Sequence, residues 1–309
     1  MTTQRPNDAH VDKAAFSGMS DFHLYAIAVL IWGSTWLAIK FQLGTVPPAV
    51  SVVWRFGLAA AILFFYAAWK RMPLRFSGRE HAWIALQGLS MFGINYIAVY
   101  VSEESLASGL VAVIFSLMAF FNIVAMRAFY ATPLEAKSLF GCALGIGGVV
   151  LVFWPEIASF SATGNALLGA ALALAATAVA TLGNIAATRN QRAGMAIVPL
   201  NAWAMLYGAA FVALYAVLNR EPFAFDWSFP YVASLAYLSL FGSVVAFGAY
   251  LALMARIGPH RAGYSSVAIP VVALLLSTLF ENLQWGVPMV VGIALCLSGN
   301  LLVLSLRNS

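Results

Sequence analysis

The sequence predicts an all-α integral membrane protein with ten transmembrane helices, arranged as two inverted five-helix repeats. Three observations lead to this fold class. The 309 residues are 62% hydrophobic and only 9% charged, which is more apolar surface than a single soluble core can hide. The apolar segments run for about 18 to 24 residues, the length of a membrane-spanning helix. The chain also repeats part of its own pattern.

Proline and glycine separate the predicted helices. Breakers such as Pro47-Pro48 and Gly258-Pro259 stand between apolar segments, where these residue types interrupt helices. The segments lack the alternation of hydrophobic and polar residues that marks a membrane β-strand. We therefore expect helices over residues 22–41, 49–69, 81–101, 107–127, 136–153, 165–187, 196–218, 230–253, 262–280 and 286–305.

The positive charges gather in alternate loops. Of the 16 Lys and Arg residues, 13 lie in the two tails or in alternate loops, and Arg220 alone lies in the other loops. Lys40 and Arg55 fall within predicted helices. Because cytoplasmic loops carry the excess of Lys and Arg, we expect an even number of helices and both termini in the cytoplasm. The cytoplasmic tails are then residues 1–21 and 306–309.

The last helices of the two halves share a pattern. Residues 141–153 read GCALGIGGVVLVF and residues 292–304 read GIALCLSGNLLVL. Chance similarity between two helices rich in small residues is the alternative. Because each half has five helices, an odd number, the second half crosses the membrane in the opposite orientation, as in many secondary transporters. The repeats are then residues 22–153 and 165–305, joined by an outer linker over 154–164.

The first predicted helix carries two indoles and an ammonium on one face. Trp32, Trp36 and Lys40 are spaced i, i+4 and i+8, which aligns them at 3.6 residues per turn. A charge within a membrane span favours a face directed into a cavity or a polar interior. The alternative is that Lys40 extends to the lipid headgroups. We favour the interior, because the chain keeps that side nearly free of Lys and Arg.

The third predicted helix carries a stripe of aromatic residues. Phe92, Tyr96 and Tyr100 follow the same spacing, with Asn95 beside them. Such a stripe can stack an apolar ligand while the phenols and the amide orient its polar end. An aromatic belt at the membrane interface is the alternative, and it suits Tyr100 better than Tyr96.

Other polar residues within the predicted helices have two interpretations each. Asn122 and Asn184 either bridge helices or line a site. Pro270 frees a backbone carbonyl, which either shapes a pocket or kinks the helix. We take Asn122 and Pro270 as structural. The candidate substrate-binding residues are Trp36, Lys40, Asn95, Tyr96, Tyr100, Asn184, Tyr237 and Ser266.

Arg55 and Glu281 are expected to have structural roles. Arg55 lies about two turns inside its helix, roughly 9 Å along the axis, where a guanidinium needs an acceptor. We favour bonds to helix-end carbonyls over direct contact with a ligand. Glu281, at the outer end of the ninth helix, is a candidate partner for either Arg55 or Lys40.

The acidic residues all lie away from the middle of the predicted helices. Since proton-coupled carriers usually need an intramembrane carboxylate or histidine, we expect uncoupled transport down the substrate gradient. Glu103 and Glu104 are expected to form a solvated pair in a short outer loop. Cys142 and Cys296 fall inside predicted helices and give no support for a disulfide framework.

The sequence resembles the EamA-type repeats of the drug/metabolite transporter superfamily. The resemblance rests on Trp-Gly-Ser followed by Lys (residues 32–40), on Pro-Pro and Trp-Arg-Phe (47–56), on AGYSSVAIPVV (262–272) and on Phe-Glu-Asn (280–282). It covers about residues 22–305. The two halves are not equivalent in sequence. The counterpart of Glu281 in the first half is Tyr130, and residues 180–188, which correspond to the Trp-to-Lys segment, lack Trp and Lys. Any binding site is therefore expected to be asymmetric.

The resemblance implies a multi-pass transporter of the bacterial inner membrane that exports small metabolites by alternating access around a central cavity. Within the superfamily, the chain looks most similar to exporters of aromatic amino acids, which implies aromatic or neutral amino acids as substrates. A multidrug, lipophilic-cation or lipid exporter of the same fold is the alternative.

A membrane-embedded enzyme that modifies lipids is a remote alternative. Such chemistry needs acid/base pairs or metal ligands, and the sequence has no paired Asp motif and no His cluster. We therefore expect no catalytic residues, no metal and no cofactor. The expected partners are a small-molecule substrate and membrane lipids, without nucleic acid, and the protein is expected to be a monomer.

Overall fold

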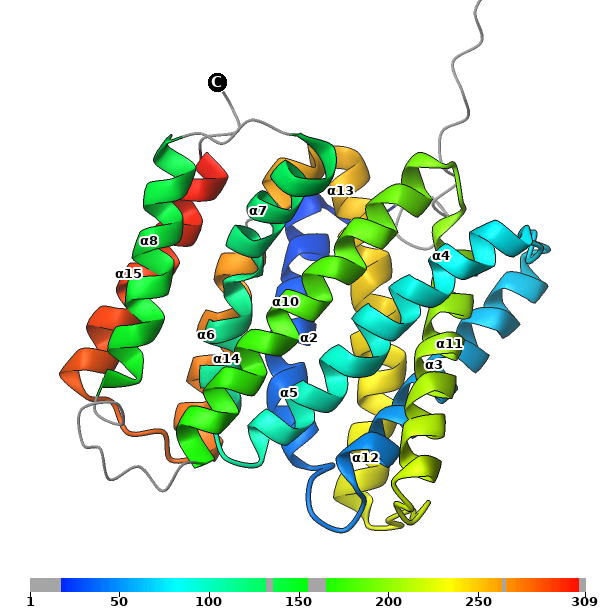
Figure 1. The fold of residues 1–309 in the computed structure, drawn as a ribbon, viewed down its shortest axis with the longest axis horizontal. Coiled ribbons are helices and arrows are strands. Elements are labelled where there is room, and N and C mark those ends of the chain that lie inside the picture. The colour runs from blue at the N-terminus through cyan, green and yellow to red at the C-terminus, as the bar shows by residue number, and fades with distance from the viewer. Residues whose placement is uncertain (1–17, 132–135, 155–164, 263–264, 306–309) are drawn as a thin grey trace, which may run out of the picture.

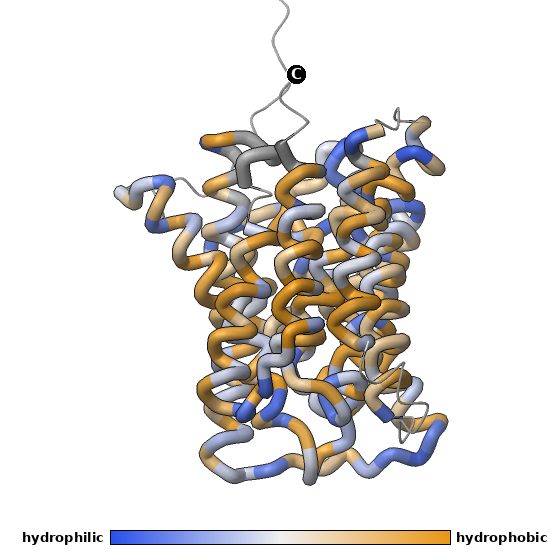
Figure 2. The backbone as a smooth tube through the Cα atoms, turned by 90° about the vertical axis from the view of Figure 1, so that its left-hand side faces the viewer, coloured by the Kyte–Doolittle hydropathy of each residue, from blue (hydrophilic) through white to orange (hydrophobic). Residues whose placement is uncertain are grey.

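The computed structural model describes residues 18–131, 136–154, 165–262 and 265–305. Within these ranges the regular elements are all helices. Seven helices are long and apolar enough to cross a membrane, and shorter apolar helices cover Leu139–Val152, Ser265–Phe280 and Val287–Leu302. Figure 2 shows hydrophobic residues along the middle of the bundle and hydrophilic residues toward its two ends. The described residues therefore have the architecture of a multi-pass membrane protein.

The helices follow the predicted ranges closely. Two predicted ends are too early, since the sixth helix continues to Arg192 and the eighth to Ala262. Most of the predicted linker and most of both tails lie outside the described residues. The elements are α2 (Asp21–Lys40), α3 (Pro48–Trp69), α4 (Gly78–Gly88), η1 (Leu89–Ile94), α5 (Asn95–Glu103), α6 (Ser108–Ser116), α7 (Met118–Tyr130), α8 (Ala136–Val152), α10 (Asn165–Arg192), α11 (Ile197–Leu218), α12 (Phe229–Tyr237), η2 (Leu238–Val245), α13 (Ala246–Ala262), α14 (Ser265–Phe280) and α15 (Val287–Ser305).

Local sequence explains several helix starts. Pro48 occupies the first position of α3, where its missing N–H leaves no intrahelical bond unmade. The Ser77 hydroxyl accepts from the N–H of Glu80, and the Glu80 carboxylate accepts from the N–H of Ser77. This reciprocal pair is a capping box at the start of α4. Pro48 therefore marks the start of α3 as predicted, whereas the predicted break at Gly258-Pro259 is wrong, because α13 continues through both residues to Ala262.

Helices that are distant in the sequence pack side by side. α8 lies against α15, α3 against α11, and α2 against α13 and α14 (Figure 1). The close approach of α8 and α15 requires glycine. A Cβ added to Gly148 would lie 2.5 Å from the carbonyl oxygen of Gly292, and one added to Gly292 would lie 2.5 Å from that of Gly148. Small residues at this interface let the two backbones touch.

The two π-helical segments share a sequence. η1 begins LSMFG at residues 89–93, and η2 begins LSLFG at residues 238–242. A π-helix widens the helical turn, and such segments occur frequently at functional sites. In η2, the carbonyl of Gly242 accepts a hydrogen bond from Trp32 Nε1 at 3.1 Å. The same short pattern therefore produces the same uncommon helix in both halves of the chain.

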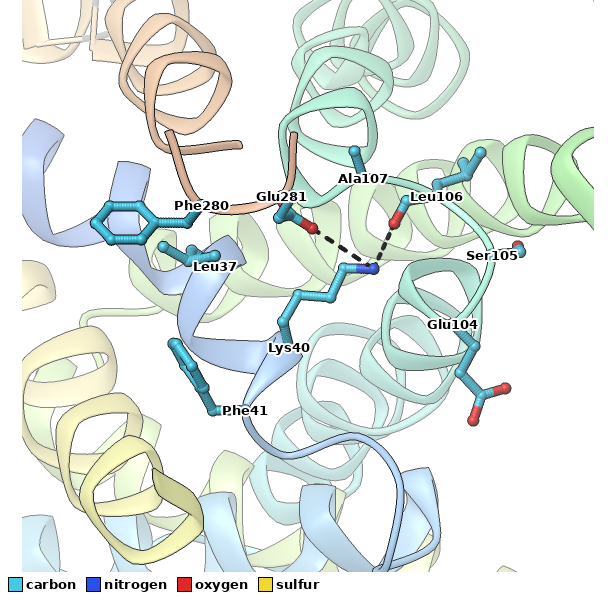
Figure 3. A pocket seen from close by; sticks show the side chains of 9 residues that line it. All are labelled: Leu37, Lys40, Phe41, Glu104, Ser105, Leu106, Ala107, Phe280 and Glu281. Carbon is cyan, nitrogen blue, oxygen red and sulfur yellow. Dashed lines mark hydrogen bonds and ion pairs between the residues drawn. The ribbon is translucent and has the colours of Figure 1, made fainter. Parts of the chain in front are cut away.

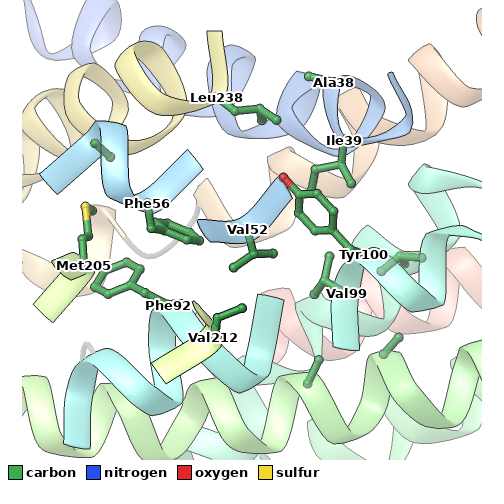
Figure 4. Packing of buried hydrophobic residues seen from close by; sticks show 14 of the residues in the cluster. Ala38, Ile39, Val52, Phe56, Phe92, Val99, Tyr100, Met205, Val212 and Leu238 are labelled. Carbon is green, nitrogen blue, oxygen red and sulfur yellow. The ribbon is translucent and has the colours of Figure 1, made fainter. Parts of the chain in front are cut away.

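The hydrophobic core surrounds the middle of the bundle. Phe56, Phe92, Met205 and Leu238 are fully buried and belong to one cluster, whose packing is shown in Figure 4. The rings of Phe56 and Phe92 lie 5.2 Å apart. Large apolar side chains such as Phe65 are exposed instead, as expected for a surface that faces lipid. This core holds the polar residues described next.

Candidate functional site

Protein atoms hold the ammonium of Lys40 at the end of α2. Its Nζ donates to the main-chain carbonyls of Glu103 and Leu106, the latter at 2.6 Å. The same atom lies 3.6 Å from Oε1 of Glu281 (Figure 3). The Lys40 side chain is 26% exposed. Its ammonium is therefore held by protein groups at one end of the bundle. We call this end of the molecule the Lys40 end.

Glu281 connects the end of α14 to the start of α6. Its carboxylate accepts from the N–H of Ser108 at 3.1 Å and from the hydroxyls of Ser108 and Ser277. A negative charge is favourable at a helix N-terminus. Of the two partners expected for Glu281, the structure brings Lys40 against it.

A pocket of about 570 Å³ opens beside this ion pair. It lies at the Lys40 end of the bundle, where α2 ends and α6 begins. The expected cavity was central, so this pocket is a different feature. Figure 3 shows its lining residues, which are Leu37, Lys40, Phe41, Glu104, Ser105, Leu106, Ala107, Phe280 and Glu281.

The two indoles on the same face of α2 contact other helices. The ring of Trp32 lies 5.1 Å from that of Phe247 in α13. The ring of Trp36 lies 5.2 Å from that of Phe115 in α6. Trp32, Trp36 and Lys40 thus all contact other helices, and each is partly buried.

Arg55 is buried among aromatic rings. Its side chain is 2% exposed, and its Cζ lies 4.6 Å from the ring centre of Tyr96 and 5.1 Å from that of Phe56. The Nε and Nη1 atoms have no hydrogen-bond partner. The prediction that Arg55 donates hydrogen bonds to helix-end carbonyls is therefore wrong for these two nitrogens. The guanidinium lies over the rings of Phe56 and Tyr96 instead, and the N–H groups of these two nitrogens remain unbonded.

Tyr100 faces the protein interior. Its side chain is fully buried, and its hydroxyl donates to Oε1 of Gln42 at 2.5 Å. Nε2 of Gln42 has no partner. The alternative that Tyr100 belongs to an aromatic belt at the membrane interface is therefore wrong. Arg55 interacts electrostatically with both Tyr96 and Tyr100, so the predicted stripe and the buried arginine belong to one group.

Glu103 does not behave as the sequence predicted. It ends α5 and is 0% exposed, with neither carboxylate oxygen hydrogen-bonded. Its neighbour Glu104 is exposed. The expected solvated pair is thus wrong for Glu103, because the last turn of α5 directs this side chain inward. Gln42, Arg55, Tyr96, Tyr100 and Glu103 are called the central polar cluster below.

The predicted amides make contacts within the protein. Asn184 Nδ2 donates to Oδ1 of Asn122 at 3.3 Å, which bridges α10 and α7. Asn95 Nδ2 donates to the carbonyl of Met91 at 3.0 Å, whereas its Oδ1 has no partner. The contacts of Asn122 and Asn184 thus agree with the bridging interpretation, and Asn95 keeps a free acceptor.

The last two predicted residues, Tyr237 and Ser266, come from helices that supply no residue of the central polar cluster. Tyr237 shares a hydrogen bond of 2.7 Å with the hydroxyl of Ser34, which joins α12 to α2. Ser266 is half-buried in α14, and Pro270 is buried inside the same helix. The structure therefore gathers Tyr96 with Arg55, whereas the hydroxyl of Tyr237 is bonded to Ser34.

Three buried amides, those of Gln42, Gln87 and Asn190, were not among the predicted residues. Gln42 belongs to the central polar cluster, and Gln87 lies at the opposite end of the bundle. There Asn190 Nδ2 donates to Gln87 Oε1 at 3.0 Å, and Gln87 Nε2 donates to Asn201 Oδ1 at 3.3 Å. The sequence held one signal for Asn190, which follows Lys40 by 150 positions. This spacing is close to the offset of 151 positions between the similar segments 141–153 and 292–304.

The central polar cluster is suited to binding a ligand with both charges. Arg55 and Gln42 offer unused donors, Glu103 offers unused acceptors, and Tyr96 offers a ring face. Among the described residues, no group of three or more His, Cys, Asp or Glu is positioned to hold a metal ion. Cys142 and Cys296 are both free.

Comparison with known proteins relates the chain to transporters. It is 28% identical over 261 residues to the uncharacterized inner membrane transporter YedA of Escherichia coli (strain K12), covering 82% of this chain and 80% of the relative. It is 26% identical over 277 residues to a probable amino-acid metabolite efflux pump of the same strain, covering 85% and 89%. It is 22% identical over 271 residues to the uncharacterized transporter YoaV of Bacillus subtilis (strain 168), covering 87% and 91%.

A solved structure and a family model give the same result. A crystal structure with 17% sequence identity superposes with a TM-score of 0.65, covering 91% of this chain and 95% of the other. This likeness supports the fold. The model of the EamA-like transporter family matches residues 22–154 and 167–305. Because these two matches span nearly the whole chain, the protein belongs to the EamA-like transporter family.

Proposed function

We propose that the protein exports small metabolites, and specifically aromatic and neutral amino acids, across the bacterial inner membrane. The observation that carries this proposal is the central polar cluster. Arg55 is fully buried beside Tyr96, and two of its nitrogens have no hydrogen-bond partner. Buried donors without partners are costly, so a ligand that supplies acceptors is favoured there.

Each functional group of an aromatic amino acid has a suitable partner around the central polar cluster. Its carboxylate suits the guanidinium of Arg55, because the planar donors of arginine fit a carboxylate. Its ammonium suits Glu103, and an aromatic side chain suits the rings of Tyr96 and Phe56. The name of one relative, a probable amino-acid metabolite efflux pump, supports the same substrate class.

Transport proceeds by alternating access between two inverted five-helix repeats, with both termini in the cytoplasm. The shared sequence of η1 and η2 supports this arrangement, because it recurs at an offset of 149 residues. The offset between Lys40 and Asn190 is nearly the same. In inverted repeats the substrate site lies between the halves, and the central polar cluster reaches from Arg55, about two turns inside α3, to Glu103 at the end of α5.

Export of a lipophilic cation is the second candidate function. The unbonded carboxylate of Glu103 and the nearby rings would also suit an organic cation. Arg55 opposes this ligand, because a cation has no group for the unused guanidinium nitrogens. The amino acid therefore explains more of the cluster.

The test is uptake of labelled phenylalanine into proteoliposomes that contain the purified protein. Unlabelled tryptophan, threonine and a lipophilic cation serve as competitors, and empty liposomes serve as the control. We expect tryptophan to abolish uptake, threonine to reduce it and the cation to leave it unchanged. Uptake of the cation in place of phenylalanine would favour the second candidate, and uptake of neither would contradict both.

A further inference from the structure

The two halves of the chain make equivalent contacts at opposite ends of the bundle. Trp54, near the start of α3, donates from Nε1 to the carbonyl of Ala224, 3.1 Å away. Trp203, near the start of α11, donates in the same way to the carbonyl of Leu74, 3.0 Å away. The two tryptophans lie 149 positions apart in the sequence, and the two acceptors lie 150 positions apart. A contact at one end therefore indicates where to look for its counterpart at the other end.

The same correspondence locates the counterparts of the ion pair at the Lys40 end. Asn190 follows Lys40 by 150 positions and lies near the end of α10. Tyr130 precedes Glu281 by 151 positions and is the last residue of α7. Figure 1 shows α10 ending at the top of the view and α2 ending toward the bottom. The top is the end whose loops are rich in Lys and Arg, which we expect to face the cytoplasm.

A buried amide network joins the end of α10 to the first half of the chain. Asn190 is 0% exposed, and its Nδ2 donates to Oε1 of Gln87 on α4 at 3.0 Å. Nε2 of Gln87 in turn donates to Oδ1 of Asn201 on α11 at 3.3 Å. Separation of α10 from α4 would break this network, and a buried amide that loses its partner is costly.

Two arginines of the same helix end lie on aromatic rings of the first half. Cζ of Arg189 lies 5.0 Å from the ring centre of Trp83 on α4. Cζ of Arg192 lies 4.3 Å from the ring centre of Tyr130 on α7. Within the part of the chain that the structure describes, neither arginine forms an ion pair. Rings and amides thus hold this end, whereas a carboxylate and an ammonium meet at the other.

We propose that the end of α10 closes the cytoplasmic side of the transport path, as the inverted counterpart of the Lys40 end. The group formed by Gln87, Arg189, Asn190, Arg192 and Tyr130 is called the α10 closure below. Alternating access requires the two closures to open in turn. The α10 closure opens when the end of α10 leaves α4 and α7, which breaks the bond between the amides and lifts both guanidinium groups from their rings. This inference rests on the alternating access of the proposed function, but not on the identity of the substrate.

The first measurement follows access from the cytoplasmic side and needs no substrate. Ala186 is buried on α10, about one turn before Asn190. After Cys142 and Cys296 are replaced, Ala186→Cys is treated with a membrane-impermeant maleimide in inside-out vesicles. We expect Asn190→Ala to raise the labelling rate by about tenfold, because the closed state loses its buried hydrogen bond. Unchanged labelling in Asn190→Ala would overturn the proposal.

Variants of the two ends should have opposite effects on this labelling. Lys40→Met opens the other end, and alternating access then keeps the α10 closure shut, so labelling of Ala186→Cys should become slower. Tyr130→Leu should raise the rate by about threefold, since it removes the ring beneath the guanidinium. Tyr130→Phe retains the ring and is the matched control. An equal rise in Lys40→Met and Asn190→Ala would indicate general loosening of the bundle and would contradict the proposal.

The second measurement holds the α10 closure shut. Tyr130→Cys and Arg192→Cys are combined on the same background, and a bifunctional methanethiosulfonate bridges them from the cytoplasmic side. We expect bridging to abolish phenylalanine transport and a reductant to restore it. The reagent should not change transport by either single-cysteine variant. Continued transport by the bridged protein would refute the α10 closure. Faster labelling in Asn190→Ala without any phenylalanine transport would refute the proposed substrate alone.

Discussion

The ammonium of Lys40 lies 3.6 Å from Oε1 of Glu281, and the two residues come from opposite halves of the sequence. Lys40 ends α2, whereas Glu281 directly follows α14 and accepts from the N–H of Ser108 at the start of α6. One ion pair thus connects three helices at the same end of the bundle. Because the Glu281 side chain is only 13% exposed, solvent screens this pair less than an exposed one.

Replacing Lys40 by Met should open the Lys40 end. The substitution removes the ammonium that joins the Glu103 and Leu106 carbonyls to Glu281. We expect a cysteine introduced at Ala107, in the pocket wall, to react with a membrane-impermeant maleimide about tenfold faster in Lys40→Met, the factor that 1.4 kcal/mol produces. Transport should fall in parallel. Unchanged reactivity together with full transport would show that the ion pair does not hold this end closed.

Replacing Arg55 by Lys should weaken binding of amino acids. Lysine retains the positive charge but lacks the planar donors that fit a carboxylate. We expect the KM for phenylalanine to rise by about tenfold, whereas Arg75→Gln, at an exposed loop position, should have no effect. Phenylethylamine, which lacks the carboxylate, is the matched ligand. An equal loss for both compounds would contradict contact between Arg55 and the carboxylate.

Replacing Gly148 by Ala should destabilise the bundle. The added Cβ would lie 2.5 Å from the Gly292 carbonyl oxygen, whereas a Cβ on the adjacent Gly147 meets no atom within 4 Å. Overpacking of this kind lowers the free energy of unfolding by about 1–3 kcal/mol. Thermal unfolding of the purified protein in detergent should therefore occur at a lower temperature for Gly148→Ala but not for Gly147→Ala. Equal stability of the two variants would refute the close contact of α8 and α15.

The Lys40 end is expected to face outward from the cytoplasm. Thr45 and Arg75 are both exposed, in loops at opposite ends of α3. After Cys142 and Cys296 are replaced, a membrane-impermeant maleimide applied to intact spheroplasts should label Thr45→Cys and spare Arg75→Cys. The positive-inside bias of the loops is the reason. Labelling of Arg75→Cys alone would invert the topology.

The sequence by itself determined the helices and the residues that share one face of α2. Hydrophobic length and the Pro and Gly breakers located most helix ends within a few residues, because a helix in lipid satisfies its backbone hydrogen bonds locally. The spacing of Trp32, Trp36 and Lys40 indicated that they share one face of α2, since periodicity is a local property. The LSxFG pattern of η1 and η2 is also visible in the sequence, at residues 89–93 and 238–242.

Only the tertiary structure decided the partners of the polar residues. Whether Glu281 pairs with Lys40 or Arg55, and whether Glu103 is solvated or buried, depends on how α2, α5 and α14 lie against one another. Local sequence does not contain that information, because Glu103 and Glu104 are equally acidic neighbours. Neighbouring helix positions point roughly 100° apart, so the Glu103 side chain is buried in the bundle and that of Glu104 lines the pocket. The burial of the Glu103 carboxyl group therefore arises from packing rather than from any motif.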